Sequence, residues 1–501
     1  MNRLEKLYLP FLIIIVASAY LLSYYLSYKV NGEDYLLFSL SDGLIYAQYV
    51  KNMLLGNFYQ YNIGEYTTGT TSFLWPYVIF IFGKILFISP DKVHIVFHIV
   101  SFLLIIFSSI LSFKTLDILT ENKTLSFVGS LTSLLYYKLI WTSMSGLEIN
   151  FAIFILYLSI YFLISNREKI FIVVSSLFFI IRPEMILLNI PFFVYFLTKK
   201  SYKNTCIYLS LIVLWILISF IVYYSISDKF FPSTFYSKST VISFLSIIKN
   251  SIIFIPEYLF SYSENNNSFI LFTFIIVGYL LLINKNTPKH IIYTYIGILL
   301  FIFYKTILSP GLGQMNRYMI FIEPLILFLF FYSIKDAVNK KYIYILSLAI
   351  TVFSFIYFSS LKNPAIVNSM NQGSKKMSEY IINNINENEP IAIENAGMKY
   401  FLKNKTVDIV GLTSKDLNVQ ENKYRQNDMS FIFNYLSNNN IKYIQFFPEW
   451  FIRIYGSEPP FLEKIYEYKI ENPLFNVKIW GLYKFNKKDY NAYISNNDGK
   501  K

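Results

Sequence analysis

"SDGLIYAQYVKNMLLGNFYQYNIGEYTTGTTSFLWP", residues 41–76, is a polar and aromatic stretch between two strongly apolar ones. It contains a single early acid, Asp42, a row of tyrosines, and a final turn rich in Gly and Thr. The pattern predicts a short amphipathic helix over 42–55, with Ser41 or Asp42 accepting from its first backbone N–H groups. Gly56 is placed to end this helix.

The apolar stretches around this segment indicate the class of protein. The chain has 501 residues, of which 55% are hydrophobic and 15% charged, whereas soluble domains carry about 25% charged residues. Apolar runs approaching the roughly 20 residues that cross a bilayer lie near 7–29, 72–90, 93–113, 124–141, 148–165, 170–198, 205–226, 268–284, 290–308, 317–334 and 341–358. The sequence therefore predicts an α-helical, polytopic membrane protein.

The distribution of charge predicts the sidedness of the chain. The net charge is +13. The basic residues gather in short turns between apolar runs, which is typical of the cytoplasmic loops of membrane proteins. This placement does not favour nucleic-acid binding. These turns lie at 1–6, 166–169, 199–203, 285–289 and 335–341. Placing them in the cytoplasm puts residues 30–71 and the C-terminal part outside it, with about eleven crossings. The run 72–90 is then expected to be re-entrant or interfacial.

The texture of the sequence changes near residue 360. Strand-like runs in 361–501 ("IAIENAG", "TVDIV", "IKYIQFF" and "KIWGLYKF") alternate with helix-like stretches such as 374–386 and 428–438. This alternation predicts a small α/β domain. The chain is therefore expected to consist of a transmembrane domain, 1–360, and an extracytoplasmic α/β domain, 361–501.

Charged residues interrupt the apolar run 170–198 at its midpoint, where Arg182, Pro183 and Glu184 follow one another. A charged residue at mid-bilayer costs about 2.5–3.5 kcal/mol on insertion scales, and proline breaks the helical hydrogen-bond ladder. Two interpretations remain open. Two short helices meet at a wet cavity that Arg182 and Glu184 face, or the two residues form a structural pair that holds a kink.

Three further polar places are predicted at the same membrane face. Glu148 ends "MSGLE", Lys238 ends "FFPSTFYSK", and Arg317 lies in "GLGQMNRYM". Ionisable residues at such places in a membrane protein are candidates for function. The alternative for Lys238 and Arg317 is that their charged ends reach the lipid headgroups.

Taken in order, these segments resemble the GT-C family of membrane glycosyltransferases. The opening stretch is similar to the first exterior loop of bacterial and archaeal members, and "SGLE", "RPE", "FPSTFYSK" and "NRYMIFIEPL" follow in the family's order. "IAIENAGMKYFLKNKTVDIVGLTS" is similar to the family's C-terminal motif, so the resemblance covers most of the chain. It is closest to arabinofuranosyltransferase-like and mannosyltransferase-like members that use polyprenyl-phosphate sugars. Ser41 replaces the first of two family acids, and Gln48 replaces an arginine.

The resemblance implies a GT-C fold at the cell membrane and an inverting transfer of sugar from a polyprenyl-phosphate donor. The acceptor would be a glycan, lipid or protein outside the cytoplasm, and Asp42 would be the general base. The expected donor-phosphate ligands are Lys238, Arg317 and Arg182. The expected substrate-binding residues are Tyr46, Tyr49, Glu148, Tyr236 and Glu184. No cofactor is expected, because side chains suffice for a monophosphate leaving group, although a divalent metal is compatible with the site.

A different class of protein shares several of these features. A lipid-linked-sugar flippase or transporter without catalysis also has many spans, a broken helix and intramembrane charge. The single acid on the first loop and the exterior α/β domain favour an enzyme, because transport requires neither. An oligosaccharide polymerase or ligase that uses a lipid diphosphate would carry more arginines on a large exterior loop.

Overall fold

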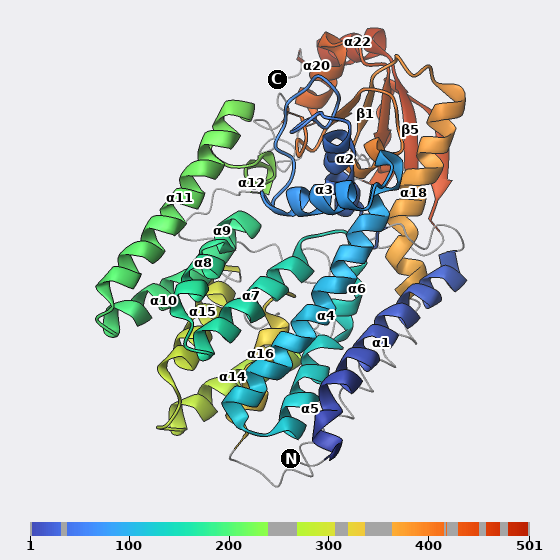
Figure 1. Cartoon of the computed structure of the whole chain (residues 1–501). Coiled ribbons are helices and arrows are strands. Elements are labelled where there is room, and N and C mark those ends of the chain that lie inside the picture. The colour runs from blue at the N-terminus through green and yellow to red at the C-terminus, as the bar shows by residue number, and fades with distance from the viewer. Residues whose placement is uncertain are drawn as a thin grey trace.

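The chain folds into a bundle of helices with a small mixed β-sheet at one end (Figure 1). The computed structural model describes residues 3–31, 38–238, 268–305, 319–335, 363–414, 417, 429–449, 457–470 and 479–498. The helices of the bundle are α1 (Tyr8–Asn31), α4 (Val93–Thr120), α5 (Lys123–Leu134), α6 (Tyr137–Ser143), α7 (Ile149–Ile164), α8 (Glu168–Ser176), α9 (Phe178–Ile181), α10 (Ile186–Thr198), α11 (Tyr202–Ser227), α14 (Ser268–Ile283), α15 (Lys289–Phe303) and α16 (Glu323–Ser333).

Three helical stretches within the described residues are long and apolar enough to cross a membrane. They span Tyr8–Lys29, Pro90–Thr120 and Tyr202–Ser227, with 22, 31 and 26 residues. The other apolar helices are shorter, and the predicted run 341–358 lies outside the described residues. The predicted count of about eleven crossings therefore stays a prediction.

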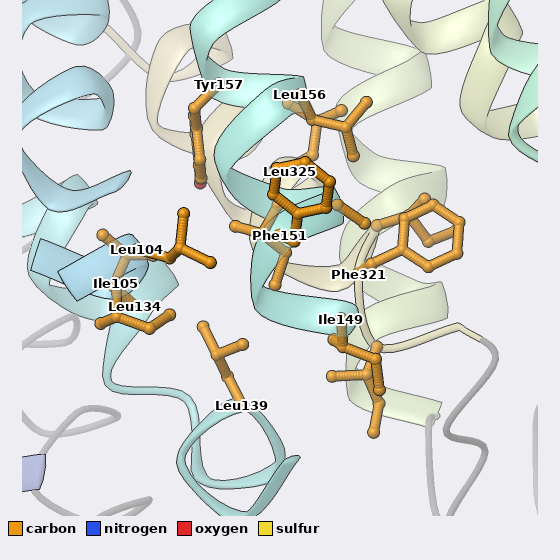
Figure 2. Close-up of a cluster of buried hydrophobic side chains, with 14 of the residues drawn as sticks. Leu104, Ile105, Leu134, Leu139, Ile149, Phe151, Leu156, Tyr157, Phe321 and Leu325 are labelled. Carbon is orange, nitrogen blue, oxygen red and sulfur yellow. The ribbon is translucent and has the colours of Figure 1, made fainter. Parts of the chain in front are cut away.

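Apolar side chains from successive helices fill the centre of the bundle. Figure 2 shows one such cluster, in which Leu104 of α4, Leu134 of α5 and Phe151 of α7 lie close together. Full burial of a side chain of this size contributes about 1.5–3 kcal/mol. This core fixes how the helices that carry the polar segments are placed.

The outer surface of the bundle is also apolar. On α11, Leu209, Val213, Leu217 and Ile221 repeat every four residues and are between 43% and 67% exposed. Residues at this spacing share one face of a helix. An extended apolar surface on a helical bundle is typical of contact with lipid, and it agrees with the predicted membrane protein.

The helical run 170–198 is broken where the sequence predicts a break. α9 ends at Ile181, Arg182 is extended, and the 3₁₀ turn η4 (Pro183–Met185) precedes α10. A helix end leaves carbonyl groups without helical partners. The carbonyl oxygen of Ile180 accepts from the backbone N–H groups of Phe73 and Leu74, at 3.0 and 3.1 Å. Phe73 and Leu74 therefore cap the end of the broken helix.

Two helices, α2 (Ser41–Leu54) and α3 (Trp75–Ile85), lie between the bundle and the sheet (Figure 1). α3 has 11 residues, which at 1.5 Å per residue span only about 16 Å. It is thus too short to cross a ~30 Å hydrocarbon core. Its last residue, Ile85, is 62% exposed, and Phe87, two residues after the helix, is 94% exposed. These features support the expectation that 72–90 does not span the membrane.

The C-terminal sheet has five strands in the order β2-β1-β3-β5-β4. The strands are β1 (Ile391–Ile393), β2 (Thr406–Asp408), β3 (Tyr443–Phe446), β4 (Leu462–Lys469) and β5 (Ile479–Phe485). β1 runs parallel to β2 and β3, whereas β5 is antiparallel to β3 and β4. Three helices accompany the sheet, namely α18 (Asn363–Asn384), α20 (Ser430–Asn438) and α22 (Lys487–Asp498).

The strands β1, β2, β3 and β5 and the helix α20 fall in the segments where the sequence predicts strands and a helix. α18 overlaps the predicted helix 374–386 but begins at Asn363, eleven residues earlier than predicted. β4 and α22 were not predicted. The predicted domain boundary at residue 360 lies outside the described residues. We refer to residues 363–498 as the C-terminal sheet region.

Candidate active site

Segments that are distant in the sequence meet around one hollow between the bundle and the C-terminal sheet region. The hollow is partly open to solvent, and its cavity volume is about 30 Å³. We call it the first hollow. Its lining residues are Asp42, Ile45, Tyr46, Gly69, Thr71, Leu147, Glu148, Arg182, Thr234 and Leu412.

The N-terminus of α2 packs directly against the "SGLE" segment that precedes α7. Gly43 allows this contact, because a Cβ at Gly43 would lie 2.0 Å from the carbonyl oxygen of Ser145. The backbone N–H of Ser39 donates to the carbonyl oxygen of Met144 at 2.9 Å. These contacts bring Asp42 and Glu148 to the same hollow, although they are far apart in the sequence.

Asp42 lies in the first turn of α2, which begins at Ser41. The expected cap by Ser41 or Asp42 is wrong, because the N-cap residue is Leu40, whose side chain makes no capping hydrogen bond. A carboxylate in the first turn is stabilised by the helix dipole. The predicted end of the helix is confirmed, since Leu55 is the C-cap and Gly56 follows with φ +91°.

A buried ion-pair network borders the first hollow. Arg182 Nη1 lies 3.1 Å from Glu148 Oε1, and Arg182 Nη2 lies 2.8 Å from Glu184 Oε1. Lys305 Nζ lies 3.6 Å from the same Glu184 oxygen. The side chains of Glu148 and Arg182 are each 3% exposed. Two carboxylates thus hold the guanidinium in one orientation, since charge-assisted bonds of this kind are directional.

Both interpretations of the "RPE" break describe part of this arrangement. Arg182 pairs with Glu184, as the kink interpretation expects, and Arg182 also lines the first hollow, as the cavity interpretation expects. Sequence reasoning missed Lys305, which completes the network. A lysine inside the apolar run 290–308 was the signal that could have found it.

Segment 67–72 forms one side of the first hollow, to which it contributes Gly69 and Thr71. The backbone N–H of Ser72 donates to the hydroxyl of Tyr46 at 2.9 Å, which ties this segment to α2. The backbone N–H of Ser233, in α12 (Ser233–Lys238), donates to the carbonyl oxygen of Thr68 at 3.0 Å. Segment 67–72 is therefore hydrogen-bonded to both α2 and α12.

The first loop is hydrogen-bonded to the C-terminal sheet region just after β1 and at the first residue of β2. The hydroxyl of Tyr61 donates to the carbonyl oxygen of Ala396, just after β1. Asn62 Nδ2 donates to the carbonyl oxygen of Thr406 at 2.8 Å, and the backbone N–H of Thr406 donates to Asn62 Oδ1 at 3.0 Å. The C-terminal sheet region therefore covers the site.

Asp408, at the end of β2, shapes the loop that reaches the hollow. Its Oδ1 accepts from the backbone N–H of Val410 at 2.9 Å, and its Oδ2 accepts from that of Thr413 at 2.8 Å. Burial raises the pKa of Asp408 to about 6, against the opposing effect of these hydrogen bonds. The loop positions Leu412 against Gly69. Sequence reasoning did not single out Asp408.

Comparison with known proteins identifies the fold. A scan of family models gives no match to the chain, and a sequence search of curated proteins gives none. The structure matches 95% of the chain to 76% of the apo oligosaccharyltransferase of Archaeoglobus fulgidus, with a TM-score of 0.55 at 10% identity. It matches 94% of the chain to 97% of ArnT from Cupriavidus metallidurans bound to undecaprenyl phosphate, with a TM-score of 0.54 at 9% identity. The chain has the GT-C fold.

A third GT-C structure extends the comparison. AglB from Archaeoglobus fulgidus, in complex with an inhibitory peptide and a dolichol-phosphate, matches with a TM-score of 0.50 at 10% identity. The match covers 89% of this chain and 70% of that one. The GT-C fold that the sequence motifs imply is therefore confirmed. At these identities the comparison speaks for the fold of membrane glycosyltransferases and not for individual side chains.

The GT-C fold brings four of the predicted site residues to the first hollow, namely Asp42, Tyr46, Glu148 and Arg182. Glu184 lies behind Arg182 and contacts it directly. Tyr49 lines a neighbouring hollow instead.

The remaining predicted residues lie on α12 or beyond the described residues. Tyr236 lies in α12, where Lys229 Nζ is 5.2 Å from the centre of its ring. Lys238 is the last residue of α12, and its side chain lies outside the described part of the structure. Arg317 also lies outside the described residues. Thr234, on the same helix, reaches the hollow, so "FPSTFYSK" contributes to the site through a residue that was not predicted.

Proposed function

We propose that the chain is an integral membrane glycosyltransferase that moves one sugar, with inversion, from a polyprenyl-phosphate donor to an extracytoplasmic acceptor. The observation that carries the proposal is the meeting of Asp42, Glu148 and Arg182 around one hollow. A base, a hydrogen-bond acceptor and a cation are the three groups that such a transfer needs. They come from three distant segments of a GT-C fold.

In this proposal Asp42 is the general base. The acceptor hydroxyl attacks the anomeric carbon of the donor sugar while its proton passes to the Asp42 carboxylate. The bond between the anomeric carbon and the phosphate oxygen breaks, and the polyprenyl phosphate leaves as an anion. A positioned base typically contributes 10²–10⁴-fold to the rate. A single displacement inverts the anomeric configuration.

The leaving phosphate needs positive charge at its oxygens. Arg182 borders the hollow and is held in a fixed orientation by Glu148 and Glu184. Lys238 and Arg317 remain proposed ligands of the same phosphate. With these cations the proposal requires no metal ion.

Glu148 is the proposed partner of the transferred sugar. Its Oε1 contacts Arg182, whereas its Oε2 is buried without a hydrogen-bond partner in the described part of the chain. A buried carboxylate oxygen is normally satisfied, so an unsatisfied one facing a hollow is suited to a ligand hydroxyl. Tyr46, which lines the same hollow, is the second proposed contact.

The proposed donor explains why the site lies at the end of apolar helices. The isoprenoid tail stays in the bilayer, so its phosphate is presented at the level of the headgroups. The neighbouring folds are compatible with this class of lipid, because ArnT was solved with undecaprenyl phosphate and AglB with a dolichol-phosphate.

The test is a transfer assay with purified protein and a radiolabelled polyprenyl-phosphate sugar. Asp42→Asn should lower transfer by at least 10²-fold and leave donor binding unchanged, because the carboxylate acts on the acceptor. Asp489→Asn is the matched control, since Asp489 lies on the exposed face of α22, away from the hollow.

Two outcomes contradict the proposal. Transfer by Asp42→Asn at nearly the wild-type rate rules out Asp42 as the base. Donor binding and movement across the membrane without any transfer, by the wild-type protein, support the flippase alternative.

A further inference from the structure

A second buried ion pair joins α6 to α16 within the bundle. Lys138 Nζ lies 3.7 Å from Glu323 Oε1, and the two side chains are 0% and 1% exposed. Lys138 lies in α6, and Glu323 is the first residue of α16. The proposed transfer uses neither residue, and charged residues buried inside an apolar bundle are candidates for function.

A gain in stability does not explain this pair. Removing two charges from water costs about as much free energy as their attraction returns, and apolar residues of similar volume are often at least as stable. The best-attested effect of a buried polar pair is that it fixes how helices are aligned with one another. The pair between α6 and α16 is suited to that role because α16 needs it.

The apolar side chains of α16 do not by themselves fix its rotation. Residues 323–329 are all buried, so the helix is buried on every side. A helix that is apolar all round has no single face that must point to the core. A shift of one residue moves such a helix by about 1.5 Å along its axis and turns it by about 100°, while apolar side chains still meet apolar ones.

Two polar contacts at the start of α16 remove this freedom. One is the ion pair of Glu323 with Lys138. The other is a hydrogen bond of 3.1 Å that the Tyr157 hydroxyl donates to the carbonyl oxygen of Pro324. Lys138 lies on α6 and Tyr157 on α7, the two helices on either side of Glu148. The start of α16 is thus aligned with the segment that brings Glu148 to the first hollow.

The residues just before α16 reach Arg182. Phe321 is 1% exposed, and the guanidinium carbon of Arg182 lies 5.6 Å from the centre of its ring. The ring also meets Phe301 of α15 edge-on, with 4.9 Å between the centroids. Figure 2 shows Phe321 in the same buried cluster as Tyr157. Because Phe321 lies two residues before Glu323, a rotation of α16 would move this ring away from Arg182.

The ring of Phe321 completes the contacts that orient the guanidinium. Glu148 and Glu184 hold the nitrogen atoms at its edge, whereas the ring bounds one of its faces. An aromatic face attracts a cation placed over it. Edge and face contacts together fix both the direction and the plane of the Arg182 side chain.

We propose that Lys138 and Glu323 are positioning residues for the first hollow, an inference that rests on the proposed function, in which Arg182 binds the donor phosphate. Their pair fixes the rotation of α16 and thereby keeps the Phe321 ring against the guanidinium. Neither residue touches the substrate. Both act only through Phe321 and Arg182.

The test compares the binding of radiolabelled farnesyl phosphate by purified full-chain proteins in detergent. In the first variant both charges are replaced, Lys138→Met together with Glu323→Leu. It should unfold at the wild-type temperature or above, because a whole buried pair can be replaced by apolar residues without loss. It should bind farnesyl phosphate about tenfold more weakly, as expected for the loss of one charge-assisted hydrogen bond. A pair with a merely structural role would leave the affinity unchanged.

Two further variants show whether the pair acts by position. Exchanging the charges, Lys138→Glu together with Glu323→Lys, restores an ion pair and should restore most of the affinity. Phe321→Leu should weaken binding as the double replacement does, and the two changes combined should weaken it no further, because both act through one ring. Leu329→Met is the matched control, since Leu329 is fully buried and lies about 9 Å along α16 from Glu323.

Three results would overturn the proposal. One is wild-type affinity in the double replacement at unchanged stability. Another is additive weakening by the double replacement and Phe321→Leu. The third applies if the double replacement lowers the unfolding temperature. Phe321→Leu alone then decides, and wild-type affinity in that variant overturns the proposal.

Binding does not require transfer, so the two proposals fail separately. Binding by the wild-type protein that every variant leaves unchanged overturns the positioning role alone. Binding that the double replacement weakens, without any transfer by the wild-type protein, supports the positioning role and shows that the proposed transfer is wrong. No binding of farnesyl phosphate by the wild-type protein overturns both the proposed donor and the positioning role.

Discussion

Arg182 supplies positive charge to two buried carboxylates beside the first hollow. It lies between Glu148 and Glu184, and both carboxylates are almost completely buried. A buried ion pair contributes little net stability when complete, but removing one partner leaves the other charge unpaired. Arg182 therefore has a structural role that is separate from its proposed contact with phosphate.

We predict that Arg182→Met lowers the free energy of unfolding by about 3–5 kcal/mol, because it leaves two buried carboxylates with less positive charge. The measurement is denaturant or thermal unfolding in detergent. Lys199→Met is the control, since the pair of Lys199 with Glu168 is half-exposed and such pairs contribute about 1 kcal/mol or less. Equal losses in the two variants would contradict this account of the network.

At the residue scale, the sequence named Asp42, Glu148 and Arg182 as candidates but did not name Lys305, which contacts Glu184. Asp42, Glu148 and Arg182 stand in motifs that resemble a family, so the sequence alone was enough to name them. Lys305 lies in no motif, and its importance comes only from its 3.6 Å contact with Glu184. Capping of α2 was mispredicted because the helix begins one residue earlier than expected, which makes Leu40 the N-cap.

At the scale of elements, the contact between α2 and the "SGLE" segment positions the proposed base. The helix approaches so closely at Gly43 that a Cβ there would lie 2.0 Å from the carbonyl oxygen of Ser145. Backbone atoms cannot move aside as a flexible side chain can. The position of Asp42 therefore depends on a glycine one residue away.

We predict that Gly43→Ala costs about 1–3 kcal/mol of stability through overpacking and lowers the transfer rate by displacing Asp42. Gly83→Ala is the matched control, because a Cβ at Gly83, on α3, would meet only the side chain of Leu54, at 3.4 Å. Unfolding and transfer are measured on both variants. Wild-type transfer by Gly43→Ala would show that the close approach does not position the base.

The loop after β2 gives a prediction of pH dependence. Asp408 has a pKa of about 6 in the folded state, whereas its ordinary value, expected in the unfolded state, is 3.8. The folded state therefore binds more protons between these values, and the free energy of unfolding falls as the pH rises through them. The loss is roughly 3 kcal/mol for a shift of about two pKa units.

The measurement is the melting temperature between pH 4 and pH 6.5. Asp408→Asn should remove this part of the decline, while Asp489→Asn, an exposed carboxylate on α22, should leave it in place. A melting curve with the same pH slope in all three proteins would contradict the burial of an ionisable Asp408.

The sequence predicted four of the five strands because they are apolar runs between turn residues. β4, "LEKIYEYK", was missed for a physical reason. It lies at the edge of the sheet, and edge strands carry charged residues that prevent further pairing. Its alternation is weak for the same reason, so no periodicity distinguishes it from a loop.

At the scale of the whole molecule, the proposed function requires the first hollow and the C-terminal sheet region to lie outside the cytoplasm. The basic turns predict this orientation. The prediction rests on how charge is distributed along the sequence and not on how the helices pack. How the sheet region covers α2 could not be predicted from the sequence. It depends on single long-range contacts, such as that of Asn62 with Thr406, which leave no periodic signal.

We predict that a membrane-impermeant maleimide applied to intact cells labels Ser495→Cys and does not label Lys285→Cys. Both variants are made in a Cys206→Ser background, so that each protein has one thiol. Ser495 is exposed on α22, and Lys285 is exposed in the turn between α14 and α15, which is predicted to be cytoplasmic. Labelling of Lys285→Cys alone would reverse the topology.

If the proposed function is right, a lipid-linked phosphate meets the proposed base in the first hollow. An experimental structure of the purified protein with a polyprenyl phosphate bound is the decisive measurement. We expect phosphate density in the hollow bordered by Asp42, Glu148 and Arg182. Phosphate density in the neighbouring hollow that Tyr49 lines, or at the end of the bundle opposite the sheet, would rule this out.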